Sequence, residues 1–247
     1  MGEGHSVSGV AQPVAYRVAH QVTALFPNPV FHRHALVWQA VELRLAFGEL
    51  AHDRFHIERV YRWALRLAQE AGADADLAGA TALVHDLALV PKDSPDRAQG
   101  GERSALMAGD VLSAAGYTLS DADAIAEAVR TSSWSRGLAP TNALGVVLQD
   151  ADRLDAIGAV GLLRTVACAQ YMSRPQRPGR FYHDTDPFAV SARALDDKAQ
   201  AIDHCYAKLL KLAEGLRLPS ARAEGAVRHA ALLNFLNDLR RELASTD

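Results

Sequence analysis

Four histidine and aspartate side chains are spaced so that successive helices could bring them to one metal ion. They are His56, the adjacent pair His85 and Asp86, and Asp152. Two imidazoles and two carboxylates can surround a six-coordinate divalent ion and leave two positions for water or substrate oxygens. This ligand set predicts Mn²⁺, with Mg²⁺, Fe²⁺ or Co²⁺ as alternatives, rather than a closed structural zinc site.

A metal in such a site lowers the pKa of its bound water and withdraws charge from a phosphoryl group. The pattern therefore predicts hydrolysis of a phosphoester or phosphoanhydride by a metal-bound hydroxide, with Asp86 at the reacting centre. Asp155 could orient a metal ligand or act as a general base. Arg59 could reach a metal-bound phosphate, although a salt bridge with Asp53 or Glu58 is the alternative.

The helices that must position the first three ligands follow from the apolar spacing. His56 falls on the inner stripe of a helix predicted over residues 53–71, with Asp53 as its N-terminal cap. His85 and Asp86 end the next predicted helix, over residues 76–89. Adjacent side chains diverge by about 100° on a helix, but near a helix end both can bend towards one ion.

A later helix carries the fourth ligand. Asp152 and Asp155 share its inner face with apolar residues, and burying carboxylates is costly unless a cation or hydrogen-bond donors compensate. Asp150 is the alternative fourth ligand, because it belongs to the same Gln-Asp-Ala-Asp-Arg-Leu segment.

The whole chain predicts an all-α bundle, because apolar residues recur at three- and four-residue steps and no segment alternates like a strand. Ser120 and Asp123 resemble a capping box, and the proline-containing segment 173–190 is predicted to be a surface loop that helps to form a site. A helical extension over residues 1–50 is predicted to pack on a main domain of residues 51–247. Further helices are predicted over residues 14–25, 35–50, 103–115, 121–132, 141–172, 191–216 and 220–244.

Composition narrows the class of protein. The 26 Lys and Arg against 29 Asp and Glu give a net charge of −3, which provides no basic field for nucleic-acid binding. The sequence shows neither a signal peptide nor about 18 consecutive apolar residues, so we expect a cytoplasmic protein that does not bind membranes. Cys168 and Cys205 lie in apolar helical patterns and do not indicate a disulfide framework.

Several basic residues are candidates for substrate contacts, and the expected partner is a small phosphorylated molecule. His204, Lys208 and Lys211 are spaced by four and three residues, so one helix face could present them to a polyphosphate. An ordinary solvated face is the alternative. Lys92 and Arg97 lie in the proline-containing segment after His-Asp, where they could close over phosphates.

The order of these motifs resembles that of the HD-domain metal-dependent phosphohydrolases, and more narrowly their YedJ/YpgQ-like branch. The resemblance covers about residues 50–243. It rests on HDRFHIERV at 52–60, LVHDLALVPKDSPDR at 83–97, VLQDADRLDAIGAVGLLRT at 147–165 and HCYAKLLKL at 204–212. An Arg-His pair at 228–229 adds to it, and we count Arg228 among the substrate contacts.

The resemblance implies an all-α HD-domain bundle with a divalent metal held by the four residues named first. It also implies hydrolysis of nucleotides, with pyrophosphate release from nucleoside triphosphates as one known activity, and a homodimer is compatible with the sequence. One departure concerns the segment after the fourth core helix, where the family commonly has His-Ser-Phe-Ser. Ser132 takes the place of that histidine, which removes a candidate phosphate contact or acid and argues against a second metal.

Two other functions are compatible with the motifs. A di-iron oxygenase of the same fold would need further histidines between His-Asp and the last Asp, and residues 87–151 contain none. A degenerate module that binds a nucleotide or a partner chain without turnover is the non-enzymatic alternative, which the loss of the motif histidine at Ser132 favours.

Overall fold

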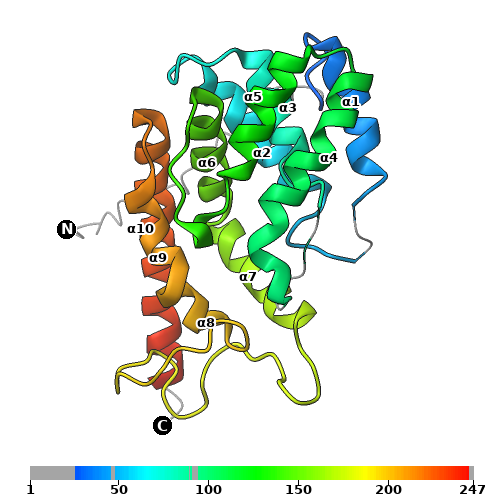
Figure 1. Ribbon diagram of the computed structural model, residues 1–247. Helices are drawn as coiled ribbons and strands as arrows, with labels where there is room; N and C mark the ends of the chain where they lie inside the picture. Colours follow the sequence, from blue (N-terminus) through cyan, green and yellow to red (C-terminus); the bar gives the residue numbers. More distant parts are fainter. Residues whose placement is uncertain (1–25, 46–47, 89, 91–93, 245–247) are drawn as a thin grey trace, which may run out of the picture.

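Most of the chain that the structure describes is helical. The computed structural model describes residues 26–45, 48–88, 90 and 94–244, and these residues form an all-α bundle without a β-strand (Figure 1). The prediction of an all-α fold is confirmed. The longer helices are α1 (His32–Glu42), α2 (Arg54–Ala68), α3 (Ala75–Val84), α4 (Gly100–Ala114), α5 (Leu119–Arg130), α6 (Ala143–Asp155), α7 (Gly158–Tyr171) and α10 (Pro219–Ala244). The shorter ones are η1 (Pro95–Gln99), η2 (Trp134–Arg136), α8 (Ala201–His204), η3 (Cys205–Leu209), α9 (Leu210–Leu212) and η4 (Ala213–Gly215).

The centre of the bundle is formed by α2, α3 and α6, which pack against one another. Along α2, Val60, Ala64 and Leu67 are fully buried, as their spacing predicts. The predicted cap is confirmed, since the Asp53 carboxylate accepts the backbone N–H of His56 at 2.9 Å. The start of α2 is therefore fixed at the turn that carries the first predicted ligand.

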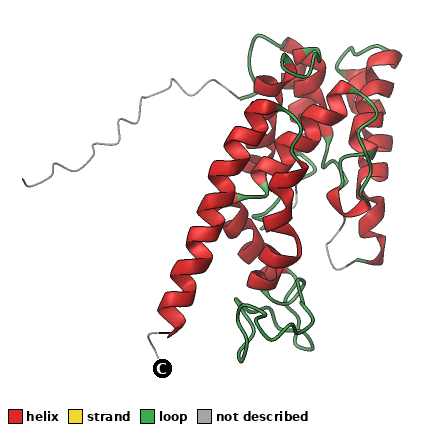
Figure 2. Ribbon diagram, turned by 90° about the vertical axis from the view of Figure 1, so that its left-hand side faces the viewer, coloured by secondary structure: helices red, strands yellow, loops and turns green. Residues whose placement is uncertain are grey.

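Two further layers cover this centre. The paired helices α4 and α5 lie on one side, and α10 packs along α7 and α6 on the other (Figure 1). In Figure 2, α10 is the long helix that leads to the marked C-terminus. The capping box of α5 is formed by Thr118 and Asp121, not by Ser120 and Asp123 as predicted. The prediction was wrong by half a turn because Thr118 directly precedes the first helical residue and can therefore accept the Asp121 N–H.

The helix predicted over residues 141–172 is two helices, α6 and α7. Gly158 starts α7 with a φ of 77°, and a Cβ at this position would lie 3.1 Å from the Cβ of Arg228 on α10. The prediction of one helix was wrong because it attributed the glycines only to close helix packing. The break allows Arg164 on α7 to bond to Asp155 at the end of α6, at 2.8 Å.

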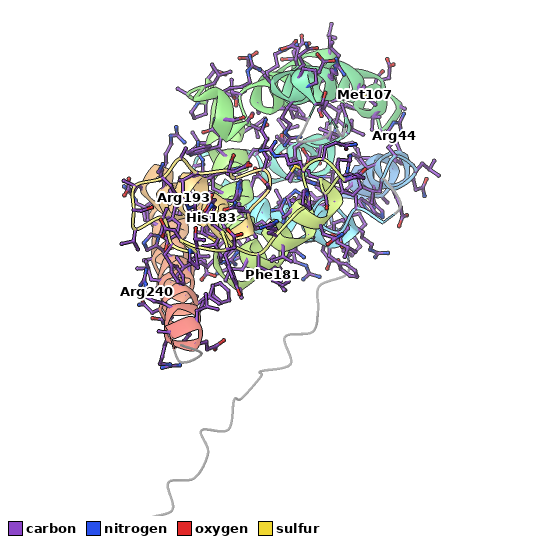
Figure 3. All side chains as sticks on the ribbon, turned by 90° about the horizontal axis from the view of Figure 1, so that it is seen from below. Arg44, Met107, Phe181, His183, Arg193 and Arg240 are labelled. Carbon is purple, nitrogen blue, oxygen red and sulfur yellow. The ribbon has the colours of Figure 1, made fainter. Side chains whose placement is uncertain are left out.

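The helix predicted over residues 191–216 starts ten residues late. Helical structure begins only at Ala201, and residues 173–200 form a loop that crosses the lower end of the molecule (Figure 3). Arg193 holds this loop, because its guanidinium donates to both oxygens of the fully buried Asp203 carboxylate at 2.6 and 2.7 Å. This tertiary ion pair fixes a segment that is rich in helix-forming Ala, Arg, Leu and Lys residues, so local helix propensity does not decide its conformation.

The N-terminal part is described from residue 26. Helix α1 is shorter than the predicted helix over residues 35–50 and packs against α3 and α4. The helix predicted over residues 14–25 lies outside the described residues. The boundary between an extension of residues 1–50 and a main domain stays a prediction.

Candidate metal centre

Four potential ligand atoms meet where α2 begins, α3 ends and α6 approaches its last turn. His56 Nε2 lies 3.2 Å from His85 Nε2, 3.6 Å from an Asp86 oxygen and 3.8 Å from an Asp152 oxygen. Two ligands that hold an ion at about 2.1 Å lie roughly 3.0 Å apart when they are at right angles. The four atoms are therefore close to the spacing of a coordination shell.

The hydrogen bonds of the two histidines show that this cluster lacks a donor. His85 Nδ1 lies 2.8 Å from the carbonyl oxygen of Ala82 and must donate to it, and His56 Nδ1 donates to the Asp155 carboxylate at 2.8 Å. In each neutral ring Nε2 then carries a lone pair, and these two lone pairs face each other and two carboxylates. A cation between them satisfies all four acceptors, so the residues fit a divalent metal.

When no metal is bound, a proton can take the place of the cation, and the charges of the cluster agree with this fit. Burial opposes protonation of His56, but its hydrogen bonds to Asp155 and Asp86 outweigh burial, and the pKa of His56 is raised. Burial also opposes ionisation of Asp86 and Asp152, yet the charge of His85 and His56 keeps the pKa of both carboxyl groups below the usual range. Two ionised carboxylates beside two imidazoles are the charge pattern that a divalent cation neutralises.

Asp155 is bonded on every side within the bundle. It is fully buried and accepts hydrogen bonds from His56, from Arg59 at 2.5 and 3.1 Å, and from Arg164 at 2.8 Å. Burial opposes its ionisation, but the bonds to His56 and Arg59 hold its pKa well below the usual range. This geometry favours an orienting role for Asp155 over general-base catalysis.

Arg59 and Asp150, two other predicted candidates, are directed to other partners. Arg59 was predicted to contact a phosphate or to pair with Asp53 or Glu58. Its guanidinium instead binds Asp155, and Arg59 does not line the pocket. The Asp150 carboxylate accepts the backbone N–H groups of Arg217 and Leu218 at 2.9 and 2.8 Å. Since Asp150 and Asp152 are two residues apart, they lie on nearly opposite sides of α6, and only Asp152 reaches the cluster.

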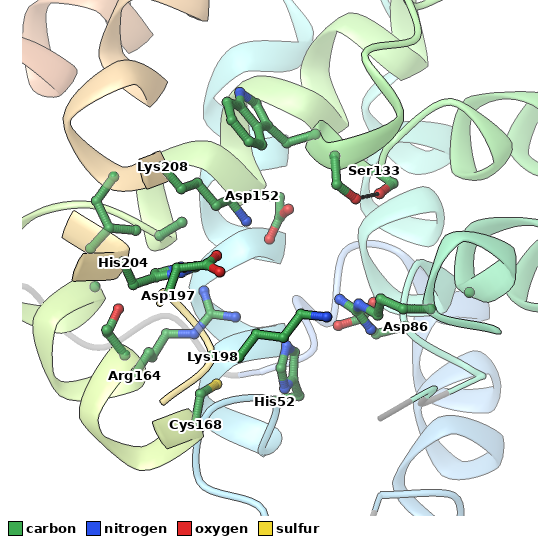
Figure 4. Close-up of a pocket in the computed structure, with 18 of the residues that line it drawn as sticks. His52, Asp86, Ser133, Asp152, Arg164, Cys168, Asp197, Lys198, His204 and Lys208 are labelled. Carbon is green, nitrogen blue, oxygen red and sulfur yellow. Dashed lines mark hydrogen bonds and ion pairs between the residues drawn. The ribbon is translucent and has the colours of Figure 1, made fainter. Parts of the chain in front are cut away.

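A pocket of about 270 Å³ opens beside the cluster (Figure 4). His85, Asp86 and Asp152 lie in its wall, and the two carboxylate side chains are 28% and 36% exposed. This volume is close to the lower end of the range for small-ligand pockets, which is about 300 Å³. The candidate metal centre is therefore accessible to a small molecule from the side of its carboxylates.

The predicted substrate contacts are divided by the structure. Arg97, His204 and Lys208 line the pocket, whereas Lys211 and Arg228 do not. Arg228 instead binds Glu224 at 2.7 Å and the carbonyl oxygen of Leu154. Lys92 lies outside the described residues.

The separation of Lys208 from Lys211 has a local cause. The segment Cys205–Leu209 is a π-helical turn, which is wider than an α-helical turn and changes the face on which later residues emerge. His204 and Lys208 consequently share the pocket face, while Lys211 is exposed elsewhere. The sequence prediction placed all three on one face because it assumed regular α-helical spacing.

Further pocket residues were not predicted from the sequence. Arg164 enters from α7, and Asp197 and Lys198 enter from the loop over residues 173–200, where their side chains point into the pocket (Figure 4). The position of this loop was predicted, but its acidic and basic pair was assigned to a helix. Ser132 also lines the pocket, and its hydroxyl donates to the carbonyl oxygen of Val129 at 2.8 Å.

Comparisons with known proteins place this site in a family. The model of the HD domain matches residues 55–157, which contain all four residues of the cluster. The uncharacterized protein YpgQ of Bacillus subtilis (strain 168) is 30% identical over 200 residues, which cover 79% of this chain and 86% of YpgQ. This chain belongs to the HD-domain family. The resemblance inferred from the sequence motifs is thereby confirmed.

Solved structures of HD-domain relatives agree with the fold. The complex of Bacillus subtilis YpgQ with ADP has a TM-score of 0.63 at 28% identity and covers 86% of this chain and 99% of YpgQ. A protein from Lactobacillus plantarum has a TM-score of 0.65 at 28% identity, with 87% and 98% of the two chains covered. A Bacillus thuringiensis HD-superfamily hydrolase shares the fold at a TM-score of 0.58 and 24% identity, with 86% and 98% covered. None of the described helices is long and apolar enough to cross a bilayer.

Proposed function

We propose that this chain is a divalent-metal-dependent phosphohydrolase that acts on a nucleotide or another small phosphorylated metabolite. The observation that carries the proposal is the convergence of His56, His85, Asp86 and Asp152 on one point at the wall of a pocket with several cationic side chains. Mn²⁺ is the proposed ion, with Mg²⁺, Fe²⁺ or Co²⁺ as alternatives, because the set combines imidazoles with carboxylates.

The protein would supply the ligands and keep them oriented. Asp155 holds His56 through Nδ1 and the Ala82 carbonyl holds His85 through Nδ1, so both rings direct Nε2 to the metal position. When bound, the metal supplies an acidified water at neutral pH and a positive charge beside the phosphoryl oxygens. Asp86 and Asp152 keep the exposed side of the centre open to the pocket.

Cationic side chains around the pocket suit a phosphorylated ligand. Arg97, Arg164, Lys198 and Lys208 come from four separate segments and line the same space. Asp197 lies among them, and one of its carboxylate oxygens is 3.4 Å from His204 Nδ1. Lysine and arginine side chains bind phosphate oxygens through charge-assisted hydrogen bonds.

A nucleotide is the proposed substrate class because YpgQ was solved in complex with ADP, and the chain covers 99% of that structure. Trp134 offers an aromatic face in the pocket, and the ammonium group of Lys208 lies 5.6 Å from the centre of its ring. A planar base could stack on such a ring while its phosphates reach the metal. Pyrophosphohydrolase and phosphatase activity are both compatible with this arrangement.

The test is a phosphate- and pyrophosphate-release screen over nucleotides with the metal-free protein and added Mn²⁺, Mg²⁺ or Co²⁺. We expect release that depends on metal and disappears in Asp152→Asn. Asp123→Asn is the matched control, because Asp123 is an exposed aspartate on α5 far from the cluster in sequence. Tight nucleotide binding with no turnover under any metal would contradict the proposal and favour the binding module without turnover.

A further inference from the structure

A second cluster of potential ligands lies between the segment before α2 and the last turn of α7. Glu49, His52 and Cys168 each contribute one ligand atom, and these atoms lie within 4.8 Å of one another. We propose that these three residues bind a second divalent cation, of the zinc-like class that accepts sulfur ligands. The cluster shares no residue with the first centre, so this inference does not depend on the proposed phosphohydrolase activity.

The cluster is protected from solvent. Glu49 is 5% exposed and Cys168 is 7% exposed, and the His52 side chain is 9% exposed. A carboxylate that is buried to this degree is costly unless a cation or several donors compensate its charge. The three ligand atoms therefore come from two distant segments and meet inside the protein rather than on its surface.

Glu49 and His52 are already in direct contact. A Glu49 oxygen lies 2.6 Å from His52 Nδ1, and the other oxygen accepts the backbone N–H of Ala51 at 3.1 Å. Burial opposes ionisation of Glu49, but the contact with His52 outweighs it and lowers the pKa of Glu49 to about 2. A cation held by both side chains would replace the proton that they share.

The donor set decides the class of cation. Sulfur, imidazole nitrogen and carboxylate oxygen together suit Zn²⁺, whereas Mg²⁺ and Mn²⁺ prefer oxygen-rich sites. Ligand atoms around a tetrahedral Zn²⁺ lie roughly 3.3–3.8 Å apart, so side-chain shifts of about 1 Å would close the site. The Cys168 thiol would release its proton on binding, as metal-ligating thiols do.

This second site would open into the same pocket as the first. His52 and Cys168 line the pocket, and their side chains lie on the side opposite Ser133 (Figure 4). The rings of His52 and His56 are 5.7 Å apart between centroids, so the two centres adjoin. Three protein ligands with a fourth position towards a pocket is the pattern of zinc sites that bind water or substrate. Ser132, the departure from the family motif, is not part of this cluster.

Cobalt titration tests the inference, because a thiolate bound to Co²⁺ gives a charge-transfer absorption in the near ultraviolet that nitrogen and oxygen ligands do not give. We expect this band when Co²⁺ is added to the metal-free, full-length protein, and its loss in Cys168→Ser. Cys205→Ser is the matched control, since Cys205 is the other cysteine of the chain, is buried and lies outside the cluster. The band should persist in that variant and also in Asp152→Asn, which alters only the first centre.

Zinc stoichiometry gives an independent readout on the same proteins. Wild type should retain two equivalents after dialysis against Zn²⁺, and Cys168→Ser and His52→Gln one equivalent each, with unchanged helical circular dichroism. The His52 variant keeps the test decisive if the cysteine variant does not fold. Absence of the cobalt band in wild type, its persistence in Cys168→Ser, or a zinc content that is the same in wild type, Cys168→Ser and His52→Gln would overturn the inference.

Discussion

His85–Asp86 and His183–Asp184 are the same dipeptide in two parts of the molecule. The first ends α3 inside the bundle, where the side chains are 3% and 28% exposed. The second lies in the loop over residues 173–200, where the side chains are 32% and 68% exposed and the two residues contact each other at 3.5 Å. Only the first pair has another imidazole and another carboxylate within reach of the same point.

The difference shows that the structural surroundings of a His-Asp pair create a site, and that the dipeptide motif alone does not. At the end of α3 the ring of His85 is fixed by the Ala82 carbonyl and faces buried acceptors from α2 and α6. In the loop, His183 Nδ1 accepts weak hydrogen bonds from the backbone N–H groups of Thr185 and Asp186, at 3.4 and 3.3 Å. That pair stabilises a turn and does not collect ligands.

The largest expected effect is a difference in turnover between variants of Asp86 and Asp184. Asp86→Asn removes an anionic ligand, so we expect a loss of more than about 100-fold in metal-dependent turnover, beyond the 10–100-fold that changes around metal ligands typically cost. Asp184→Asn should stay within about twofold of wild type. The measurement is kcat/KM for phosphate or pyrophosphate release with saturating Mn²⁺, and equal losses in both variants would break the comparison.

The next largest effect is expected at Asp155, which orients the proposed metal ligand His56. Asp155→Asn weakens the hold on His56, so metal affinity should fall about 10–100-fold in calorimetric titrations. It also leaves Arg59 and Arg164 without their buried partner, which costs about 3–5 kcal/mol of unfolding free energy. Affinity equal to wild type would show that Asp155 does not orient the centre.

Asp155 also predicts how stability responds to acid. Its pKa is lowered in the folded protein, so its contribution is present above its ordinary pKa of about 3.9 and is lost as the pH falls below that value. The unfolding free energy of metal-free Asp155→Asn should therefore decline less steeply than wild type between about pH 5 and 3 in urea titrations. The unfolding free energy of Asp184→Asn should follow the wild-type slope with pH. If Asp155→Asn also followed the wild-type slope, this account would be contradicted.

A second matched pair sharpens the comparison on one helix. Lys208→Ala should lower kcat/KM about tenfold. A hydrogen bond between charged groups contributes about 1.5–3 kcal/mol, and the lower value corresponds to about a tenfold change in rate. Lys211→Ala should have no effect, since the π-helical turn directs Lys211 away from the pocket. Steady-state kinetics on both variants decide the matter, and a larger loss in Lys211→Ala would refute the assignment of faces.

The smallest effect is expected in the exposed loop. His183→Asn should change the unfolding free energy by less than about 0.5 kcal/mol, because surface positions without buried partners rarely exceed that value. Metal content should be unchanged. Loss of bound metal in this variant would place ligands in the loop, against the comparison of the two pairs.

The grouping of the four side chains could be foreseen, because each lies on a strongly periodic helix or at its end. His56 shares its stripe with three buried residues, and the order of motifs matched the HD-domain family. The structure brings His56, His85, Asp86 and Asp152 together, and their binding of a metal stays a prediction. Asp150 could not be excluded from sequence, because its backbone donors come from Arg217 and Leu218, some 67 residues away.

Features that depend on long-range contacts could not be predicted. The loop over residues 173–200 is fixed by Arg193 and Asp203, and no local signal shows that this ion pair prevents a helix. The cluster of Glu49, His52 and Cys168 joins segments more than 100 residues apart, so it could not be predicted from residue spacing along the chain. The glycine at 158 was a readable signal for the break between α6 and α7.

The central claim is that one divalent ion sits between two histidines and two aspartates. The most direct measurement is a crystal structure of the Mn²⁺-loaded protein with diffraction data collected at the manganese absorption edge. We predict an anomalous peak bonded to His56 Nε2, His85 Nε2, Asp86 and Asp152 at about 2.0–2.2 Å. A protein that hydrolyses its substrate with Mn²⁺ but shows no peak at this point would contradict the account.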